Sequence, residues 1–369
     1  MSCQGKKLLI AGGGTGGHLF PALAICEEWE AQGGEVLFVG TPRGLENRIL
    51  PQKGKNLALI NVGKIKGGGI TGRIKTVLGL PMALMSAIKI LREFKPDVVL
   101  GVGGYASTPA VAAARLLFIP TAIHEQNAMP GLSNRMLSRI ATKIFISFSA
   151  AKEHFAHKNI QLTGNPVNQE FHNQAIKPPP KEGEPWHILI FGGSLGAKVF
   201  GEIVPPALAQ LKEEGINFQV QHQVQTDSIE QVQKFYNENN ITAQTAAFFH
   251  NMSAVYAKAD IVICRAGATT VTELSALGKP ALLIPYPYAA DDHQAANAQA
   301  YADKGAGWMR RQEETTPQWL TDFLKQCFKN PAELKSKAQN AKKLATPNAA
   351  QDIVKGLLGL LKHNKIDNS

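Results

Sequence analysis

The sequence has few cysteines, and they stand far apart. The 369 residues contain four, Cys3, Cys26, Cys264 and Cys327, and no pair has the C-x-x-C spacing of a metal or redox motif. We therefore expect neither a disulfide framework nor a zinc site, and a reducing compartment suits the chain best.

Long apolar runs are also missing. The run that begins at Leu8 breaks into glycines after Ala11 and is too short for the core of a signal peptide. The longest candidate for a membrane span, residues 76–91, contains Pro81 and Lys89. It falls short of the ~18–20 uncharged apolar residues of a spanning helix. We expect a protein that is soluble or lies on a membrane surface.

Acidic residues are the scarcer charge. The chain has 39 basic and 29 acidic residues, which leaves a net charge of +10. This surplus fits nucleic acid, an anionic membrane or a phosphorylated ligand and does not choose among them. With 44% hydrophobic and 18% charged residues, the composition is globular and excludes a largely disordered chain. At ~100–200 residues per domain, the length suggests two domains.

What the sequence does contain is a loose internal repeat. Residues 7–18 read KLLIAGGGTGGH, and residues 187–197 read HILIFGGSLGA, about half the chain later. Each is a short apolar run followed by glycines. A buried strand, a glycine-rich turn and a helix open a doubly wound α/β domain. The repeat predicts two Rossmann-like domains in tandem.

Short apolar strands and helical stretches extend this pattern. We expect strands at residues 35–39, 97–101, 121–124, 143–146, 218–221, 261–264 and 281–285. We expect helices at 21–32, 108–118, 270–277, 294–304 and, with an amphipathic pattern, 349–362. Residues 177–185 (KPPPKEGEP) have linker composition, which places the domain boundary between Gly164 and Pro185.

The first glycine cluster raises the question of a dinucleotide. Gly12, Gly14 and Gly17 satisfy G-x-G-x-x-G after a strand. The acid that grips the ribose in such sites is absent, because the second strand leads into GTPR. NAD is disfavoured, NADP with Arg43 on its phosphate remains an alternative, and neither cluster continues into a Walker loop. The backbone N–H groups suit a phosphate, or the glycines serve only a tight turn.

The second half carries a sharper group of residues. After the strand 261–264 the chain reads RAGATTVTE, a glycine turn that opens a helix. Gly267 permits close approach to a ligand, and Glu273 could accept both hydroxyls of a ribose. The alternative for Glu273 is a solvated glutamate beside the helix dipole. In the next loop, Asp292 is a candidate N-cap and Gln294 could present its amide to a sugar.

Seven segments in order carry a family resemblance: GGGTGGHLFPALAI, GVGGYASTPA, HEQNAMPG, GNPV, GGSLGA, RAGATTVTELSALGKPALLIPYP and DDHQAANA. Together they resemble the MurG family, whose members transfer N-acetylglucosamine from a UDP donor to lipid I (undecaprenyl-pyrophosphoryl-N-acetylmuramyl-pentapeptide) and form lipid II. The resemblance implies an α/β fold of the GT-B type, two Rossmann-like domains facing across a cleft. Residues 1–165 with the helix 346–369 would bind acceptor and membrane, and residues 166–345 would bind the UDP-sugar.

The resemblance also implies roles for single residues. Donor binding would fall to Thr15, Gly16, Gly17, Asn127, Gly193, Ser194, Arg265, Gly267, Glu273 and Gln294. The acceptor diphosphate would lie on the backbone N–H groups of Gly13, Gly14, Gly103 and Gly104, beside Tyr105. Three positions depart from the family pattern. Asn168 and Leu195 stand where Arg and Gln are usual, and Lys198 replaces an arginine and would supply part of the charge that the donor diphosphate needs.

The implied reaction needs a base for the muramyl 4-hydroxyl, which attacks the anomeric carbon with inversion and releases UDP. His18 is the first candidate, because imidazole titrates near neutrality and the residue follows the glycine loop. His18 could instead orient the loop or bind acceptor phosphate. Glu125 is the second candidate. No metal and no cofactor are expected, since D-x-D is absent and HEQN is not H-E-x-x-H.

A basic stretch indicates how such an enzyme would reach a lipid. Residues 53–92 contain eight Lys and Arg residues and no acid. Among them lie the apolar residues Ile74, Val77, Leu78, Leu80, Met82, Leu84 and Met85. This pairing suits an anionic membrane and a peripheral enzyme on the cytoplasmic face of a bacterial plasma membrane. The alternative is a core helix with solvated lysines. Nucleic acid is not expected as a partner, because basic and aromatic residues do not interleave.

Three other functions stay open at this point. They are another GT-B transferase that uses a nucleotide sugar, an NADP-dependent oxidoreductase, and a non-catalytic protein that binds a UDP-sugar. The choice of acceptor would identify another transferase, and binding of NADPH would identify the oxidoreductase. Binding of a UDP-sugar without turnover would identify the non-catalytic protein.

Overall fold

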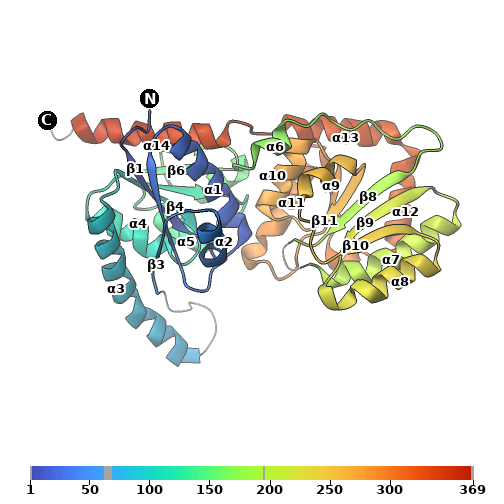
Figure 1. The fold of residues 1–369 in the computed structure, drawn as a ribbon, viewed down its shortest axis with the longest axis horizontal. Helices are drawn as coiled ribbons and strands as arrows, with labels where there is room; N and C mark the ends of the chain where they lie inside the picture. Colours follow the sequence, from blue (N-terminus) through green and yellow to red (C-terminus); the bar gives the residue numbers. More distant parts are fainter. Residues whose placement is uncertain (1, 62–68, 194–195, 367–369) are drawn as a thin grey trace. The chain divides into compact units, whose positions relative to one another are not determined.

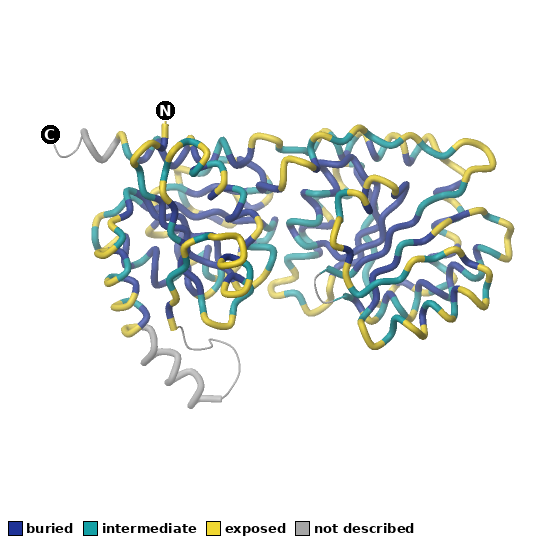
Figure 2. The backbone as a smooth tube through the Cα atoms, in the orientation of Figure 1, coloured by how far each residue is buried: buried dark blue, intermediate teal, exposed yellow. Residues whose placement is uncertain are grey.

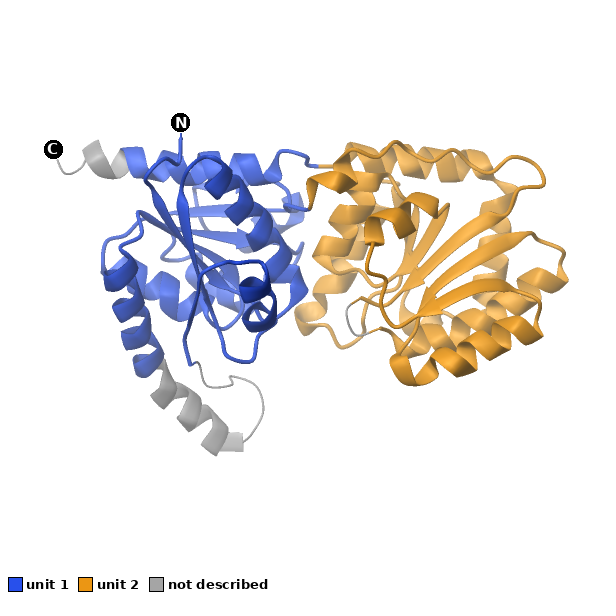
Figure 3. Cartoon of the chain, viewed as in Figure 1, with its two compact units in different colours: residues 1–167, 346–369 blue, residues 168–345 orange. Residues whose placement is uncertain are grey.

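The computed structural model describes residues 2–61, 69–193 and 196–366, with the side chains of residues 69–80 and 363–366 left out. The chain divides into two compact units, residues 1–167 with 346–369 and residues 168–345 (Figure 3). Each unit is a parallel sheet between helices (Figure 1). The inner strands of each sheet are the buried centre of the unit, whereas the strands at the sheet edges are partly exposed (Figure 2).

The first unit has a parallel sheet with the strand order β3-β2-β1-β4-β5-β6-β7 in its described residues. The strands are β1 (Lys7–Gly12), β2 (Glu35–Gly40), β3 (Leu57–Leu59), β4 (Val98–Gly103), β5 (Thr121–Glu125), β6 (Lys143–Ile146) and β7 (Ile160–Leu162). From Leu8 to Ala11, β1 is entirely buried, as strands covered on both faces are. The strand order reverses between β1 and β4, which creates a topological switch point there.

Helices cover both faces of this sheet. They are α1 (Gly16–Ala31), α2 (Glu46–Gln52), α3 (Gly69–Phe94), α4 (Ser107–Leu116), α5 (Leu132–Leu137) and α14 (Ala349–Ile366). One core cluster joins α1 and α14, and another joins α3, α4 and α5. The amphipathic C-terminal helix therefore docks on the first unit, where it buries Ile353, Val354 and Leu357. Each such side chain contributes about 1.5–3 kcal/mol when fully buried.

The second unit repeats the plan with the strand order β10-β9-β8-β11-β12-β13 in its described residues. The strands are β8 (Trp186–Phe191), β9 (Phe218–Gln223), β10 (Thr242–Ala246), β11 (Ile261–Cys264), β12 (Ala281–Leu283) and β13 (Gly307–Met309). The helices are α6 (Gln169–His172), α7 (Lys198–Glu213), α8 (Ile229–Glu238), α9 (Met252–Lys258), α10 (Ala268–Leu277), α11 (His293–Ala302), α12 (Pro317–Lys329) and α13 (Pro331–Lys343). The prediction of two Rossmann-like units is confirmed.

Most predicted elements occur within a few residues of their expected bounds, and the misses have physical reasons. Helix α1 begins at Gly16, five residues earlier than expected, because Pro21 lies inside the helix instead of starting it. The strands β3, β7, β10 and β13 were not predicted. They are short, and β10 reads TAQTA, which has none of the large apolar residues that mark a strand.

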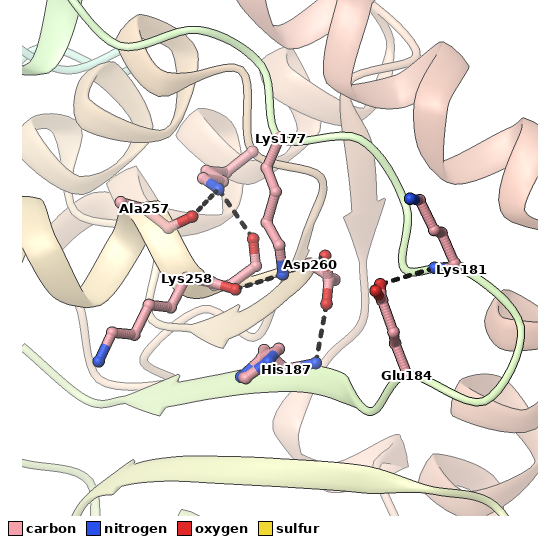
Figure 4. A network of polar contacts seen from close by, with 9 residues as sticks. Lys177, Lys181, Glu184, His187, Ala257, Lys258 and Asp260 are labelled. Carbon is pink, nitrogen blue, oxygen red and sulfur yellow. Dashed lines mark hydrogen bonds and ion pairs between the residues drawn. The ribbon is translucent and has the colours of Figure 1, made fainter.

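The segment 177–185 is not the linker that its composition indicates. It lies inside the second unit, which begins at Asn168. Lys177 Nζ pairs with Asp260 Oδ1 at 2.7 Å and donates to the Lys258 carbonyl at 2.7 Å (Figure 4). Asp260 Oδ2 in turn accepts the backbone N–H of His187 at 2.8 Å. A buried carboxylate thus anchors this proline-rich segment to the start of β8.

Candidate functional site

Each unit has a candidate site of its own, at the switch point of its sheet. In the first unit, the ends of β1, β4 and β5 lead into residues 13–15, 104–106 and 126–128. In the second unit, the ends of β8, β11 and β12 lead into residues 192–193, 265–267 and 284–286. Neighbouring parallel strands bring their carboxyl ends to one edge, where doubly wound sheets bind ligands.

In the first unit the glycine turns after β1 and β4 pack on each other. Gly12, Gly13, Gly103 and Gly104 all have positive φ, between 81° and 142°. A Cβ on Gly12 would lie 2.2 Å from the Gly103 carbonyl oxygen, and one on Gly104 would lie 2.6 Å from that of Gly13. Glycine is required at both turns because only a bare backbone fits. The structure thus brings the expected acceptor glycines together, with Tyr105 exposed beside them.

Glu46 is a site residue that sequence reasoning missed. It is the first residue of α2 and is 1% exposed. Its carboxylate accepts the Gly14 N–H at 2.7 Å, the Thr41 N–H at 2.8 Å and the Thr41 hydroxyl at 3.2 Å. A Cβ on Gly13 or Gly44 would stand 2.5 Å or 2.1 Å from this carboxyl group. The absence of side chains at Gly13 and Gly44 thus leaves the space that the Glu46 carboxyl group occupies.

These bonds correct the expected phosphate contacts of the first loop. The Gly13 N–H already donates to Gly103 O, and the Gly14 N–H donates to Glu46. Neither is free to bind a diphosphate as expected. Helix α1 starts just beyond, and the first N–H groups of a helix have no acceptor within it. Thr15, Gly16 and Gly17 are the better place for an anion on this loop.

His18 lies in the first turn of α1 and faces β4 and β5. Its Nδ1 lies 3.0 Å from Gln126 Oε1, and a Cβ on Gly103 would stand 2.9 Å from its Cε1. The ring is partly exposed, whereas Gln126 is buried. An imidazole with one nitrogen bonded to the protein can accept a proton on the other. Gln126 is a second contact that sequence reasoning missed.

Glu125, the second candidate for the base, is enclosed by hydrogen-bond donors, which disfavours that role. Its carboxylate is buried and accepts four hydrogen bonds. The donors are the N–H and Nδ2 of Asn127 at 2.9 and 3.1 Å, the N–H of Gly131 at 3.1 Å and Nδ2 of Asn134 at 2.9 Å. These bonds occupy the oxygen lone pairs that a base would use. Glu125 instead orients Asn127, the residue expected at the donor sugar.

The glycine loop of the second unit follows β8. The Gly193 carbonyl accepts the Gly196 N–H and Nε2 of Gln223, each at 3.0 Å. The expected contact Ser194 and the departure Leu195 lie outside the described residues. Lys198 is exposed and pairs with Glu202 at 3.6 Å, so its charge is shared within its own helix. Asn168 caps α6 by accepting the Glu170 N–H at 3.1 Å.

Arg265 is held as a fixed, buried cation. Its guanidinium donates to the carbonyls of Ile284 and Pro285 at 3.1 and 2.9 Å and to Gln312 Oε1 at 2.6 Å. It also lies over the ring of Tyr286, 5.5 Å from the centroid. Burial lowers the pKa of the guanidinium from its usual value. The residue therefore ties the loop after β12 to the loop after β11, next to Gly267, which precedes α10.

Glu273 is not the solvated glutamate of the alternative interpretation. Its Oε2 accepts the Tyr256 hydroxyl at 3.0 Å, and the Tyr256 ring packs edge-on against Phe191 and Phe171. Burial raises the pKa of the Glu273 carboxyl to about 7. Hydroxyl groups of a ligand would donate further hydrogen bonds to this desolvated carboxylate and would stabilise its charged form.

Gln294 joins two loops of the second unit. Its Oε1 accepts the N–H of Ala266 at 3.3 Å and that of Tyr286 at 3.0 Å. Asp292 precedes α11 but does not cap it with its side chain. It pairs with Arg311 through both oxygens, at 2.9 and 2.6 Å. Asp291 and Asp292 both have φ of 51°, a strained conformation for aspartate that this ion pair helps to hold.

The expected membrane segment lies in α3. Met82 and Met85 are 71% and 70% exposed, whereas Leu84 packs against the core and faces inward in part. Ile74, Val77, Leu78 and Leu80 belong to α3, but their side chains lie outside the described residues. Further exposed apolar side chains on the neighbouring helices α4 and α5 are Leu116, Leu132 and Met136. Among the described helices, none has the length and apolarity to cross a membrane.

Comparison with protein families matches both units. Residues 8–146 match the glycosyltransferase family 28 N-terminal domain, and residues 187–353 match the glycosyltransferase family 28 C-terminal domain. Two similar curated proteins come from Magnetococcus marinus and Geobacter metallireducens. Both are named UDP-N-acetylglucosamine–N-acetylmuramyl-(pentapeptide) pyrophosphoryl-undecaprenol N-acetylglucosamine transferase. They are 47% and 44% identical, over 97% and 94% of this chain and 98% and 97% of theirs.

A solved structure shares the whole architecture. The crystal structure of Acinetobacter baumannii MurG is 36% identical, with a TM-score of 0.81 over 96% of this chain and 99% of that one. A glycosyltransferase of kitacinnamycin, 16% identical with a TM-score of 0.69 over 95% of this chain and 99% of its own, shares the fold alone. The expected GT-B class, two Rossmann-like domains in one chain, is confirmed.

Proposed function

Because this chain belongs to glycosyltransferase family 28, we propose that it transfers N-acetylglucosamine from UDP-N-acetylglucosamine to lipid I and forms lipid II for peptidoglycan synthesis. One observation carries the proposal. Relatives with this activity in their names match 94% or more of the chain at 44–47% identity. Four of the segments that suggested the family, those that begin at Gly12, Gly101, Gly192 and Arg265, lie at the ends of β1, β4, β8 and β11, the strands at the two switch points.

The reaction requires one group of residues that activates the acceptor and another that binds the donor, and each unit supplies one of these groups. The muramyl 4-hydroxyl oxygen bonds to the anomeric carbon from the face opposite the diphosphate, so the configuration inverts. The bond between that carbon and the diphosphate oxygen breaks, and UDP leaves with the electron pair. A base takes the hydroxyl proton, and N–H groups or cations stabilise the leaving diphosphate.

The second unit supplies the donor half. Glu273 accepts the ribose hydroxyls through Oε1, since Tyr256 already occupies Oε2. Gln294 offers its Nε2–H₂ group to the sugar, because within the described chain its Oε1 makes both of its bonds. Gly193 and Gly267 let the diphosphate approach the backbone. Arg265 places a positive charge at the loop after β11, and this charge stabilises the departing UDP anion.

The first unit supplies the acceptor half. The acceptor diphosphate binds at the start of α1, with the exposed ring of Tyr105 at its side. Because the N–H groups of Gly13 and Gly14 are already bonded, this assigns to the acceptor Thr15, Gly16 and Gly17, for which the resemblance implied donor binding. His18, one residue further along, takes the proton of the muramyl hydroxyl. Glu125 acts through Asn127, whose backbone N–H and side-chain amide it holds.

Release of UDP tests this function. We expect the full chain to release UDP from UDP-N-acetylglucosamine only when a lipid I analogue is added, and to leave UDP-N-acetylgalactosamine intact. Release without the acceptor would indicate a hydrolase. UDP binding without release would indicate a non-catalytic protein, and binding of NADPH in place of UDP would indicate the oxidoreductase.

The lipid acceptor also calls for a docking surface. The exposed apolar residues of α3, α4 and α5 lie on helices that also carry Lys89, Arg92 and Arg115. Apolar side chains beside cations bind anionic lipid surfaces, with ~1 kcal/mol from each basic residue near the surface. We propose that this face holds the enzyme on the cytoplasmic side of the plasma membrane.

Replacing Met85 by glutamate should weaken membrane binding about tenfold. The substitution removes an apolar side chain from the lipid boundary and adds a charge that anionic lipids repel. Co-sedimentation with vesicles of phosphatidylglycerol and phosphatidylcholine measures the effect. Leu162→Glu is the matched control, because Leu162 is also exposed but lies on the edge strand β7. An equal loss in both variants would contradict a specific face.

A further inference from the structure

We infer that Gln126 is a positioning residue for the base: its amide oxygen holds His18 as the tautomer with hydrogen on Nδ1 and so leaves the lone pair on Nε2. The role in turnover rests on the proposed function, whereas the tautomer is a property of the folded chain. Gln126 lies in the HEQN segment. Its neutral amide carries no charge and does not titrate, so the residue type alone predicts no role in acid–base catalysis.

The orientation of the Gln126 amide follows from its surroundings. The side chain is 1% exposed, so its polar atoms must find partners within the protein. Nε2 lies 3.1 Å from the Val102 carbonyl oxygen and 3.3 Å from that of His124. Two carbonyl oxygens can only accept, so the NH₂ end of the amide must face them. Oε1 is therefore the atom that faces His18.

This orientation determines the state of the His18 ring. Nδ1 and Gln126 Oε1 are 3.0 Å apart, which is a normal hydrogen-bond length. Because an amide oxygen has no hydrogen to give, Nδ1 must carry the proton. A neutral imidazole has one N–H, so its lone pair is then on Nε2. The opposite tautomer would place two lone pairs against each other at this contact.

A second histidine, the buried His124, supports the arrangement. His124 Nδ1 lies 3.2 Å from Gln126 Nε2, and His124 Nε2 lies 3.2 Å from the Gly164 carbonyl oxygen. Burial lowers the pKa of His124 to about 4, so this ring is neutral near pH 7. Its Nε2–H faces the Gly164 carbonyl and the Ser147 hydroxyl, and its Nδ1 accepts from Gln126, whose two amide hydrogens are shared among Nδ1 and the carbonyls of Val102 and His124. The chain of bonds runs from His18 through Gln126 and His124 to Gly164.

The bond also sets the position of the ring. His18 packs against Gly103, where any side chain would meet the ring at 2.9 Å. Contact on this face and the bond to Gln126 leave few rotations open to the imidazole. When Nε2 takes the substrate proton, Nδ1 keeps its own proton and its bond. No atom of Gln126 gains or loses a proton, so the amide orients the base without titrating.

The tautomer can be measured without any assay of turnover. In ¹⁵N spectra of the full chain labelled at histidine, at a pH where the ring is neutral, we expect His18 to show a protonated Nδ1 and an unprotonated Nε2. The His18→Ala variant assigns the signals, and the exposed His154 is the internal reference. In Gln126→Leu, we expect His18 to populate both tautomers. A wild-type ring with hydrogen on Nε2 would overturn the inference.

Two substitutions separate positioning from packing. Gln126→Leu removes the acceptor oxygen and should lower kcat about 10–30-fold with the KM for UDP-N-acetylglucosamine within twofold. Gln126→Glu keeps an oxygen next to Nδ1 but adds a buried charge against two carbonyls, so it should lower the melting temperature more. If Gln126 positions the base, Glu keeps more activity per folded molecule than Leu. A purely structural role predicts the reverse order and would overturn the inference.

Failure of the proposed function gives a different result. The expected spectra with no transfer of N-acetylglucosamine would leave the tautomer standing and refute the reaction. Transfer with Gln126→Leu at the wild-type rate, at equal folded concentration, would refute the positioning role alone.

Discussion

Replacing His18 by alanine should lower kcat by about 10²–10⁴-fold, the usual contribution of general acid–base catalysis. The affinity for UDP-N-acetylglucosamine should stay within about twofold, because the donor binds to residues of the second unit. Loss of the ring removes the proton acceptor but leaves the glycine turns of β1 and β4, which are held by their own backbone contacts. Initial rates with a lipid I analogue and isothermal titration with UDP measure the two quantities.

His154→Ala is the matched control for this experiment. His154 is exposed, belongs to the same unit and lies in the short helical segment Ser149–His154 beyond β6. It should keep wild-type kcat and KM. If His18→Ala weakened donor binding as much as turnover, His18 would be a binding residue and not the base. A rise in the KM for the acceptor alone would assign it to the acceptor diphosphate.

The fold was open to prediction because it depends on patterns that are local in the sequence. The run from Leu8 to Ala11 ends in glycines at the switch point, and residues 187–197 repeat the signal in the second half. Both strands are buried on two faces beyond their first residues, Lys7 in one and Trp186 and His187 in the other, so the rest of each sequence is apolar. Strand β10 gave no such signal, since it lies at the edge of its sheet.

The partners within the site were not open to prediction, because they are distant along the chain. Gly14 meets Glu46, His18 meets Gln126, and Arg265 meets Gln312. Glu46 and Gln312 lie outside the recognisable motifs, and Gln126 lies in one but is a neutral amide to which the motif gave no role. Residue type also misled at Glu125, which has the chemistry of a base but is enclosed by four donors. Motifs indicated a candidate site, and only the packing showed which of its atoms already have hydrogen-bond partners within the protein.

Replacing Glu273 by glutamine should raise the Kd for UDP-N-acetylglucosamine about 10–100-fold. A hydrogen bond to a charged group contributes roughly 1.5–3 kcal/mol, and the amide loses the charge that two ribose hydroxyls would share. The pH dependence gives a sharper test. Because burial raises the pKa of Glu273 to about 7, the wild-type carboxyl gains a proton as the pH falls through 7. Donor binding should weaken from pH 8 to pH 6 in wild type but not in the variant.

The same substitution should stabilise the folded protein at alkaline pH. The Glu273 pKa rises from 4.5 in the unfolded chain to about 7 in the fold. Between these values the folded state holds a proton that the unfolded state has released, so this residue makes stability fall as the pH rises through that window. Glutamine carries no charge to desolvate, and its melting temperature at pH 8 should exceed that of wild type by roughly 2 °C or more.

Glu230→Gln, on the exposed side of α8, is the control and should change neither donor affinity nor melting temperature. A Glu273→Gln variant that bound the donor normally would remove this residue from the site. A variant that bound weakly and also melted earlier at pH 8 would indicate a structural carboxylate held by Tyr256. Weak binding with a raised melting temperature is the result expected of a carboxylate that is desolvated at a cost in stability, receives one hydrogen bond from Tyr256 and gains further bonds from the ribose of the donor.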